Sequence, residues 1–506
     1  GNAVPTANTL NKGDLEISVT QVAPIEAAYY GGGTGNQNYV ALFNYGLKEN
    51  ITISGFFSHS DDPLHVRIPS LEKQPSNLWV SYGTSFTWNK SLNKDLRIAL
   101  NASIENWLVK SGGCNLYRCT YKSNNIFNSS LNEVEKNNLV GSVSLPITWN
   151  ASKQFELTFS PRAIFLPDSQ GNNDGSGSFY GNSIGIGTGL EYKPTPRFKF
   201  FSSAFLPFGP GYNAFNSNLK FSRKNIYATG ISVSVDPKTA IEASVTNSFG
   251  LSPSTGILAI PSSNQMLYAL KLTYRPTNHY WSKNQSQEND KKKFNGLSVS
   301  IADFIYEGQK KIQTSFDNKG SWLSRVDWGL SDSFTVDLSF TSIGQGSHEP
   351  NSLDSDYHKI DEYFYRGGGK IKLYENDTES ITSAFRVSAG RVMGTGWIFG
   401  ELLNTYAINE RIKFNLNPKI SLSGNGNPSA IGTSIHWELI PGLSLIPETN
   451  IAIAESQNNW TLAVRFSPVQ KHFLDLYTTN SLNFLDTGQV LKAKDQSFGI
   501  NFGTIF

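Results

Sequence analysis

The chain has 506 residues and a formal net charge of +2, so it is long enough for several soluble domains or one large barrel, and nucleic acid is excluded as the default partner. Only 17% of the residues are charged, 12% are aromatic, and 44 are Gly; helix formers are scarce beside Ser, Thr, Asn, Tyr and Phe, which predicts strands and turns. No run of about 18 apolar residues occurs, which excludes a transmembrane helix but not a membrane-spanning β-barrel.

The first strand is predicted at 13–22. Leu15, Ile17 and Val19 alternate there with polar residues, and this period of two is the pattern of a strand with one dry and one wet face. We therefore expect the strands of one β-barrel domain to occupy 13–506, preceded by a short segment, 1–12.

The same alternation recurs at 96–101, 334–340 and 460–466. Short and long connections alternate along the chain. The short ones are rich in turn-forming residues, for example 48–50, 236–239 and 441–442, and the long ones are polar. Counting one strand between each short connection and the next long one gives about 24 strands, with a range of 20 to 26, in a single antiparallel barrel. The short turns are expected on the periplasmic side and the long loops on the extracellular side. The long segments are 60–76, 108–137, 167–178, 208–223, 249–263, 344–362 and 481–496.

Aromatic residues gather at one level. They precede the short turns and fall on the apolar parity of their strands, as expected of an interfacial girdle at a membrane surface. These residues are Tyr45, Trp88, Trp149, Tyr192, Trp328, Trp437 and Phe466.

Charged residues take the opposite parity. Because Arg or Lys facing lipid at the midplane costs on the order of 2 to 4 kcal/mol, these side chains are predicted to line the lumen. They are Glu16, Arg97, Glu156, Arg162, Glu191, Lys199, Glu242, Lys271, Arg325, Asp327, Asp337, Arg386, Lys413, Glu448, Arg465 and Asp475. Asp303 departs from the pattern.

Three local motifs suggest further chemistry. Cys114 and Cys119 lie close together in a Gly- and Asn-rich loop, which favours a disulfide over two free thiols. The loop 168–178 spaces oxygen ligands as calcium sites do but lacks the distal Glu of an EF-hand. We expect no cofactor, with a surface Ca²⁺ site in that loop as the alternative.

The motif "HSDDPLH" supplies His59, Asp61, Asp62 and His65 beside a strand end, where carboxylates and an imidazole could activate water. A solvated turn explains it better, and no G-x-S-x-G motif is present. We expect no catalytic residues.

The chain ends "QSFGINFGTIF", with Phe498, Ile500, Phe502 and Phe506 on one face. This strand resembles the C-terminal signature of Gram-negative-type outer-membrane β-barrel proteins. In that family the signature is read by the barrel assembly machinery and the last strand closes against the first, which implies an outer-membrane location with both termini periplasmic. "PTANTLNKGDLEISVTQ" is similar to first strands of large barrels associated with envelope polysaccharide.

A barrel of about 24 strands would be hollow, because about eight strands already fill their interior with side chains. We expect a porin-like channel for small or elongated polar solutes, with outer-membrane lipids, the assembly machinery and the solute as partners. Plugging could come from inward-folded loops, first 108–137 and then 344–362. The alternatives are an export channel for polysaccharide or another polymer, a barrel hydrolase, and a soluble secreted β-rich binding protein.

Overall fold

Two compact units make up the fold of the computed structural model, one of residues 1–26 and 36–281 and the other of 282–506 together with 27–35. Among the described residues, no helix has both the length and the apolar character needed to cross a membrane. The described residues are 4–23, 38–61, 77–111, 113–114, 122–123, 132–167, 180–215, 221–248, 250–259, 266–277, 296–343, 362–376, 378, 380–392, 395–423, 426–469 and 471–506.

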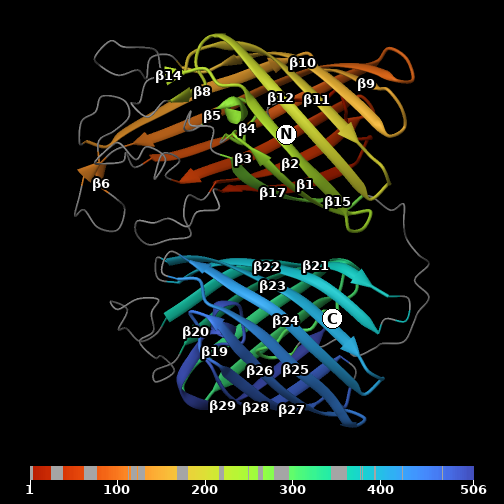
Figure 1. Cartoon of the computed structure of the whole chain (residues 1–506), viewed down its shortest axis with the longest axis vertical. Helices are drawn as coiled ribbons and strands as arrows, with labels where there is room; N and C mark the ends of the chain where they lie inside the picture. Colours follow the sequence, from red (N-terminus) through yellow and green to blue (C-terminus); the bar gives the residue numbers. More distant parts are fainter. Residues whose placement is uncertain are drawn as a thin grey trace. The chain divides into compact units, whose positions relative to one another are not determined.

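The first unit is an antiparallel barrel, named barrel 1 (Figure 1). Its first strand pairs both with the second and with the last, so the sheet closes on itself. The strands are β1 (Leu15–Ala23), β2 (Asn38–Lys48), β3 (Ile51–Asp61), β4 (Asn77–Ser91), β5 (Leu96–Ser111), β8 (Val134–Ser144), β9 (Ile147–Asn150), β10 (Phe155–Phe165), β11 (Ser183–Tyr192), β12 (Phe198–Pro210), β15 (Ile226–Ser234), β16 (Thr239–Thr246) and β17 (Leu267–Tyr274).

β8 and β9 occupy one position in this barrel. Both pair with β5 on one side and with β10 on the other, so the 13 strands fill twelve positions. The interruption between them contains Pro146, which has no backbone N–H to donate to a ladder. Its carbonyl still accepts a bond from Ala99 N at 2.9 Å.

The second unit is a closed barrel of twelve strands, named barrel 2, in which β18 pairs with β29. Its strands are β18 (Lys310–Asp317), β19 (Trp322–Ser331), β20 (Phe334–Ile343), β21 (Glu362–Glu375), β22 (Ile381–Val392), β23 (Thr395–Ala407), β24 (Ile412–Ser423), β25 (Ser429–Ile440), β26 (Leu443–Ala454), β27 (Asn459–Phe466), β28 (His472–Ser481) and β29 (Lys492–Ile505).

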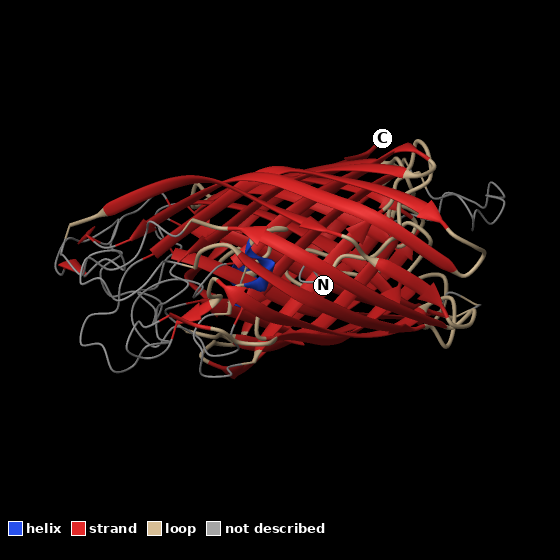
Figure 2. Ribbon diagram, turned by 90° about the horizontal axis from the view of Figure 1, so that it is seen from above, coloured by secondary structure: helices blue, strands red, loops and turns tan. Residues whose placement is uncertain are grey.

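Short elements complete the described structure, in which strands predominate (Figure 2). They are the strand pairs β6 (Gly113–Cys114) with β7 (Lys122–Ser123) and β13 (Ala214–Phe215) with β14 (Phe221–Ser222), the 3-10 helix η1 (Thr255–Ile257) and the helix α1 (Thr487–Val490).

The prediction of an all-β fold with closed antiparallel barrels is confirmed, but the single barrel of about 24 strands is wrong. The described strands fill twelve positions in each of two barrels. The expected closure of the first strand against the last is also wrong, because β1 pairs with β17 and β29 pairs with β18. Hydrophobic alternation specifies strand faces but not the partner of an edge strand, so parity alone cannot reveal where a sheet closes.

Each barrel begins and ends at the same end, which we name its tight-turn end. In barrel 1 this end carries the connections 49–50, 92–95, 151–154, 193–197 and 235–238. In barrel 2 it carries 332–333, 376–380, 408–411, 441–442 and 467–471. The opposite end, named the long-loop end, carries the longer connections, but in barrel 2 it also has short ones such as 318–321.

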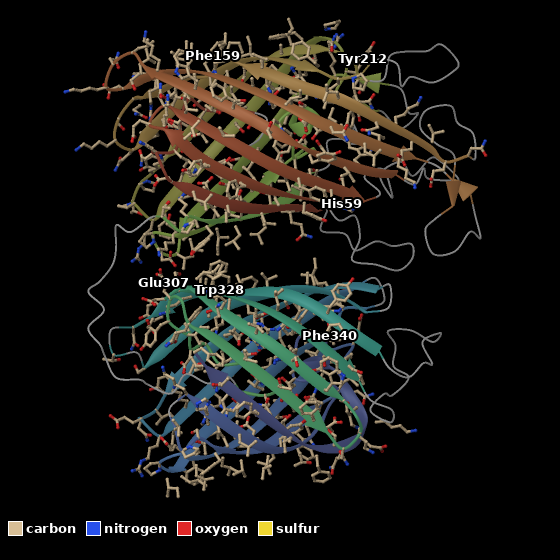
Figure 3. The ribbon with its side chains drawn as sticks, turned by 180° about the vertical axis from the view of Figure 1, so that it is seen from behind. His59, Phe159, Tyr212, Glu307, Trp328 and Phe340 are labelled. Carbon is tan, nitrogen blue, oxygen red and sulfur yellow. The ribbon has the colours of Figure 1, made fainter. Side chains whose placement is uncertain are left out.

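The outer faces of both barrels are apolar. Leu139 of β8 and Leu338 of β20 are 75% and 69% exposed, and Phe159 of β10 and Trp328 of β19 lie on the outer side of their barrels (Figure 3). The inner faces carry most of the charged and hydroxyl side chains, many of them buried. This is the reverse of a soluble sandwich, in which the apolar faces are buried against each other.

Candidate functional site: the two barrel interiors

Barrel 1 is filled at its long-loop end by the connection between β16 and β17. Residues 250–259 of this connection, named the seal segment, fold inward and include η1. Leu251, Ile257 and Leu258 of the seal segment are buried in one apolar cluster with Trp79 of β4 and Trp107 of β5. This half of the lumen is therefore a packed hydrophobic core.

Aromatic rings form the centre of that cluster. Trp79 and Trp107 meet edge to face with ring centroids 5.5 Å apart, and Tyr180 lies 5.9 Å from Trp107. Burial raises the pKa of Tyr180, because the phenolate would lose its hydration there. Such ring pairs contribute about 0.5–1.5 kcal/mol beyond the burial of their area, which stabilises the sealed end.

Two buried charges of opposite sign hold the seal segment. Glu105 of β5 accepts a hydrogen bond from Ser254 N at 2.6 Å and a second from the Ser81 hydroxyl. Arg162 of β10 donates to the carbonyl of Pro253. Both charged side chains are at least 96% buried, and hydrogen bonds to buried charges are strong.

The tight-turn end of barrel 1 is narrowed by residues 4–11, named the N-terminal segment. Ala7 N donates to Thr148 Oγ1 at 2.9 Å, and Leu10 N donates to Thr52 Oγ1 at 2.8 Å. Asn8 Nδ2 donates to Glu156 Oε1 at 3.0 Å. Most of the stretch expected as a separate segment before the barrel is thus bound to the inner wall.

Between these two segments lies a cavity of about 720 Å³. This volume falls within the range of small-molecule sites, roughly 300 to 1,000 Å³. The wall includes hydroxyl and amide side chains and four residues of each charge sign: Asp14, Glu16, Glu191, Glu242, Arg162, Lys199, Lys271 and Arg275.

Acids and bases on the cavity wall lie next to each other. Arg275 Nε is 2.7 Å from Glu16 Oε2, and Lys199 Nζ is 3.1 Å from Glu191 Oε1. Glu242 of β16 is directly opposite Lys271 of β17 in the ladder. The cavity therefore presents alternating charges and no net field of one sign.

Barrel 2 has a filled interior. Asp337 of β20 forms ion pairs with Arg325, Arg366 and Arg386 from three neighbouring strands, and all four side chains are at most 7% exposed. Arg465 of β27 binds both oxygens of Asp475, at 2.6 and 2.8 Å, a bidentate geometry.

Two inward segments complete the filling of barrel 2. The loop between β28 and β29, residues 482–491, places Asp486 between Arg366 and Arg386. Residues 296–306, named the threaded segment, precede β18 and lie among the inner side chains of β21, β23, β24 and β26. The cavity beside Phe484 has only about 20 Å³, the space of about one water.

The residues predicted to line a lumen lie in two different environments. Those of β1 to β17 surround the cavity or contact the inward segments of barrel 1, as described for Glu16, Glu156 and Arg162; Arg97 is 3.7 Å from Glu156. Those of β18 to β29 are mostly buried. Arg325, Asp327, Asp337, Arg386, Arg465 and Asp475 form buried ion pairs, Glu448 is buried against backbone amides, and Lys413 is partly exposed.

The structure explains why Asp303 departs from the predicted parity of charged residues. It belongs to the threaded segment and not to a strand, and its carboxylate pairs with Lys413. The sequence prediction failed here because the threaded segment, "GLSVSIADFIY", alternates apolar and small residues as a strand does.

Several buried charges of the interiors were missed by sequence reasoning. Glu105, Glu401 and Lys419 share the parity of predicted residues on the same or neighbouring strands, and this signal could have found them. Asp486 lies in a loop, where no pattern predicts that it turns inward.

The predicted girdle residues lie near the tight-turn ends. Tyr45, Trp88, Trp149, Trp328, Trp437 and Phe466 are between 42% and 52% exposed. Tyr192 is half-buried and stacks on Phe155 at 4.5 Å. On the last strand, Phe498, Ile500, Phe502 and Phe506 are all exposed, as a lipid-facing strand face requires.

Other predictions fall wholly or partly outside the described residues. Cys119, the side chain of Cys114, the loop 168–178, Asp62 and His65 lie there, as do 344–361 and much of 108–137. His59 is described and stacks on Tyr39 at 5.3 Å on the outer face of β3. Within the described parts of the chain, no group of three or more His, Cys, Asp or Glu could hold a metal ion.

Comparisons with known proteins gave matches among solved structures only. No protein-family model and no curated protein matches the chain. The NanC porin is 10% identical with a TM-score of 0.31, covering 51% of this chain and 98% of its own. The KdgM porin, solved with disordered oligogalacturonate, is 6% identical with a TM-score of 0.29 and covers 39% and 98%. The siderophore receptor PiuA from Acinetobacter baumannii is 9% identical with a TM-score of 0.19 and covers 99% and 82%.

Closed antiparallel barrels of even strand number, with exposed apolar outer faces and polar inner faces, define the class of outer-membrane β-barrel proteins. The expected resemblance to that class is confirmed. The described part of the chain forms two twelve-position barrels, of which the first encloses a cavity lined by polar and apolar side chains and the second has a filled interior.

Proposed function

We propose that the protein is an outer-membrane channel in which barrel 1 passes small polar solutes, while barrel 2 is closed. The observation that carries this proposal is the cavity of about 720 Å³ in barrel 1. Polar and apolar side chains line it, and at the long-loop end it is bounded by the seal segment, whose displacement would widen it. We place the tight-turn end and both termini in the periplasm of a Gram-negative-type bacterium.

The wall chemistry supports neutral or zwitterionic solutes. Four acidic and four basic residues line the cavity, mostly as neighbouring pairs. A pore lined by one charge sign would concentrate ions of the other sign. Paired charges and hydroxyl groups instead offer hydrogen bonds to polar solutes without ion selection.

Conductance in planar bilayers tests the proposal. Replacing residues 250–258 by a Gly-Ser linker of equal length should convert a mostly closed protein into one with long openings. Liposome swelling with neutral sugars of increasing size would then give the size limit. A folded variant with the same low conductance as the wild type would contradict a conduit through barrel 1.

Charge substitutions provide matched controls. Glu191→Gln with Glu242→Gln should make the opened pore anion-selective, and Lys199→Gln with Lys271→Gln should make it cation-selective. Reversal potentials in a salt gradient measure both. Equal selectivity in the two variants would mean that the solute path does not cross this cavity.

A further inference from the structure

The threaded segment of barrel 2 is held by its main chain. It runs from Gly296 to Tyr306 inside the barrel and lies outside the ladder formed by β18–β29. Its residues 297–302 are at most 7% exposed. A buried backbone needs a partner for nearly every N–H and C=O group, so the way these groups are satisfied shows what the lumen is built to bind.

One carboxylate binds three consecutive amides. Glu448 Oε1 accepts from Leu297 N at 2.8 Å, and Oε2 accepts from Ser298 N at 2.5 Å and from Val299 N at 3.2 Å. Successive N–H groups that converge in this way form an anion-binding nest. Here the anion belongs to the barrel wall and the nest belongs to the segment.

The carbonyl groups are bound by wall cations and amides. Lys419 Nζ donates to Ser298 O at 3.1 Å, and Asn417 Nδ2 donates to Ser300 O at 2.7 Å. Lys370 Nζ donates to the carbonyls of Ile301 and Asp303.

The next amide along the segment is also satisfied by the wall, because Ala302 N donates to Thr405 Oγ1 at 2.8 Å. These partners come from β21, β23, β24 and β26 and contact groups present in every polypeptide.

Apolar side chains of the segment fill separate hollows of the wall. Leu297 packs in a cluster with Ile446 and Tyr477, Phe304 in one with Leu403, and Ile305 against Phe473. The interior thus combines main-chain recognition with three side-chain pockets, as peptide-binding grooves do.

We propose that the interior of barrel 2 is a binding site for a polypeptide segment, occupied in this structure by the chain's own residues 296–306 as an exchangeable, tethered ligand. The proposal does not depend on conduction through barrel 1. It predicts that the same site accepts a segment supplied in trans.

The test uses the full chain with residues 296–306 replaced by a Gly-Ser linker of equal length. A fluorescent synthetic peptide GLSVSIADFIY should bind this protein and not the wild type, whose site is occupied. A peptide that keeps only Leu297, Ser298, Asp303, Phe304 and Ile305 and carries Ala elsewhere should bind with an affinity within about tenfold, because the main-chain contacts, the Ser298 hydroxyl bond and the Asp303 ion pair remain. A scrambled peptide is the control.

N-methylation of the peptide at Ser298 and Val299 removes two donors to Glu448. It should weaken binding roughly tenfold or more, as expected for hydrogen bonds to a charged group. If the methylated and scrambled peptides bind as tightly as the original peptide, the proposal is wrong.

A second variant covers the case in which the replaced protein does not fold. Glu448→Gln in the intact chain should speed hydrogen exchange at amides 297–299 while the amides of β24 and β26 stay protected. If the replaced protein fails to fold even when the peptide is added during refolding, or if Glu448→Gln leaves exchange at 297–299 unchanged, the segment is a fixed part of the core and the proposal is wrong.

Discussion

Val19 of β1 lies directly opposite Leu272 of β17, and this pairing closes barrel 1 without any strand of barrel 2. In a single barrel, β1 would instead pair with β29. The two arrangements differ in which pairs of positions can be bridged by a disulfide.

Cysteines at Val19 and Leu272 should therefore cross-link in a background where Cys114 and Cys119 are replaced by Ser. Opposed residues of neighbouring strands have Cα atoms about 4.5 to 5.5 Å apart, within disulfide reach. The matched pair Val19→Cys with Ile500→Cys should stay reduced, because Ile500 pairs with Phe316 and Leu476. Gel mobility with and without reductant measures both. The reverse result would restore one large barrel.

Removing one member of a buried ion pair in barrel 2 should destabilise it. Arg465 and Asp475 are each at most 1% exposed and bind each other in two places. Arg465→Met leaves Asp475 buried without its cation, which costs about 3 to 5 kcal/mol, whereas an apolar pair of similar volume is often tolerated.

Thermal unfolding in detergent should thus show a clearly lower midpoint temperature for Arg465→Met. The double variant Arg465→Met with Asp475→Leu should show a smaller decrease. The single variant Lys199→Ala, on the cavity wall of barrel 1, is the control and should unfold near the wild-type temperature. If Arg465→Met were as stable as this control, the packing inferred for barrel 2 would be incorrect.

The sequence predicts some features of the barrels and not others. It predicts which face of each strand points outward, but neither which strands close each barrel nor which segments fill the interiors. The two faces of each strand follow from alternation, because lipid outside and polar groups inside impose opposite requirements on neighbouring residues. In the structure Leu338 and Ile500 are exposed, whereas Arg386 and Glu448 are buried.

Closure and filling could not be predicted in the same way. Strand β17, which ends at Tyr274, closes barrel 1 by pairing with β1, yet its alternation of apolar and polar residues is like that of any other strand. The threaded segment reads "GLSVSIADFIY", which suits a strand, and its inward position depends on side chains such as Glu448 and Lys419 that are distant in sequence. Long-range complementarity of this kind has no local signal.

Charge on the outer faces should block assembly of either barrel. Leu270 of β17 and Ile500 of β29 are 46% and 47% exposed in the middle of the closing strands. Arginine there would face lipid, at a cost of about 2 to 4 kcal/mol near the midplane. Leu270→Arg and Ile500→Arg should each lower the amount of folded protein in outer-membrane fractions, while Leu270→Phe and Ile500→Phe should not. Unchanged levels of both Arg variants would argue against a lipid environment.

The strength of the seal in barrel 1 should depend on Glu105. Its two oxygens accept from Ser254 N and from the Ser81 hydroxyl, so Glu105→Gln keeps the shape of the side chain but removes the buried negative charge that strengthens these bonds. A hydrogen bond to a buried charge contributes about 1.5 to 3 kcal/mol, and each 1.4 kcal/mol is a factor of ten.

The open probability of single channels should accordingly rise about tenfold to a hundredfold in Glu105→Gln. Glu242→Gln removes the same charge from the cavity wall at a position that pairs with Lys271 and not with the seal segment. This control should change ion selectivity and leave the open probability unaltered. Identical gating in the two variants would show that the contact between Glu105 and Ser254 does not hold barrel 1 closed.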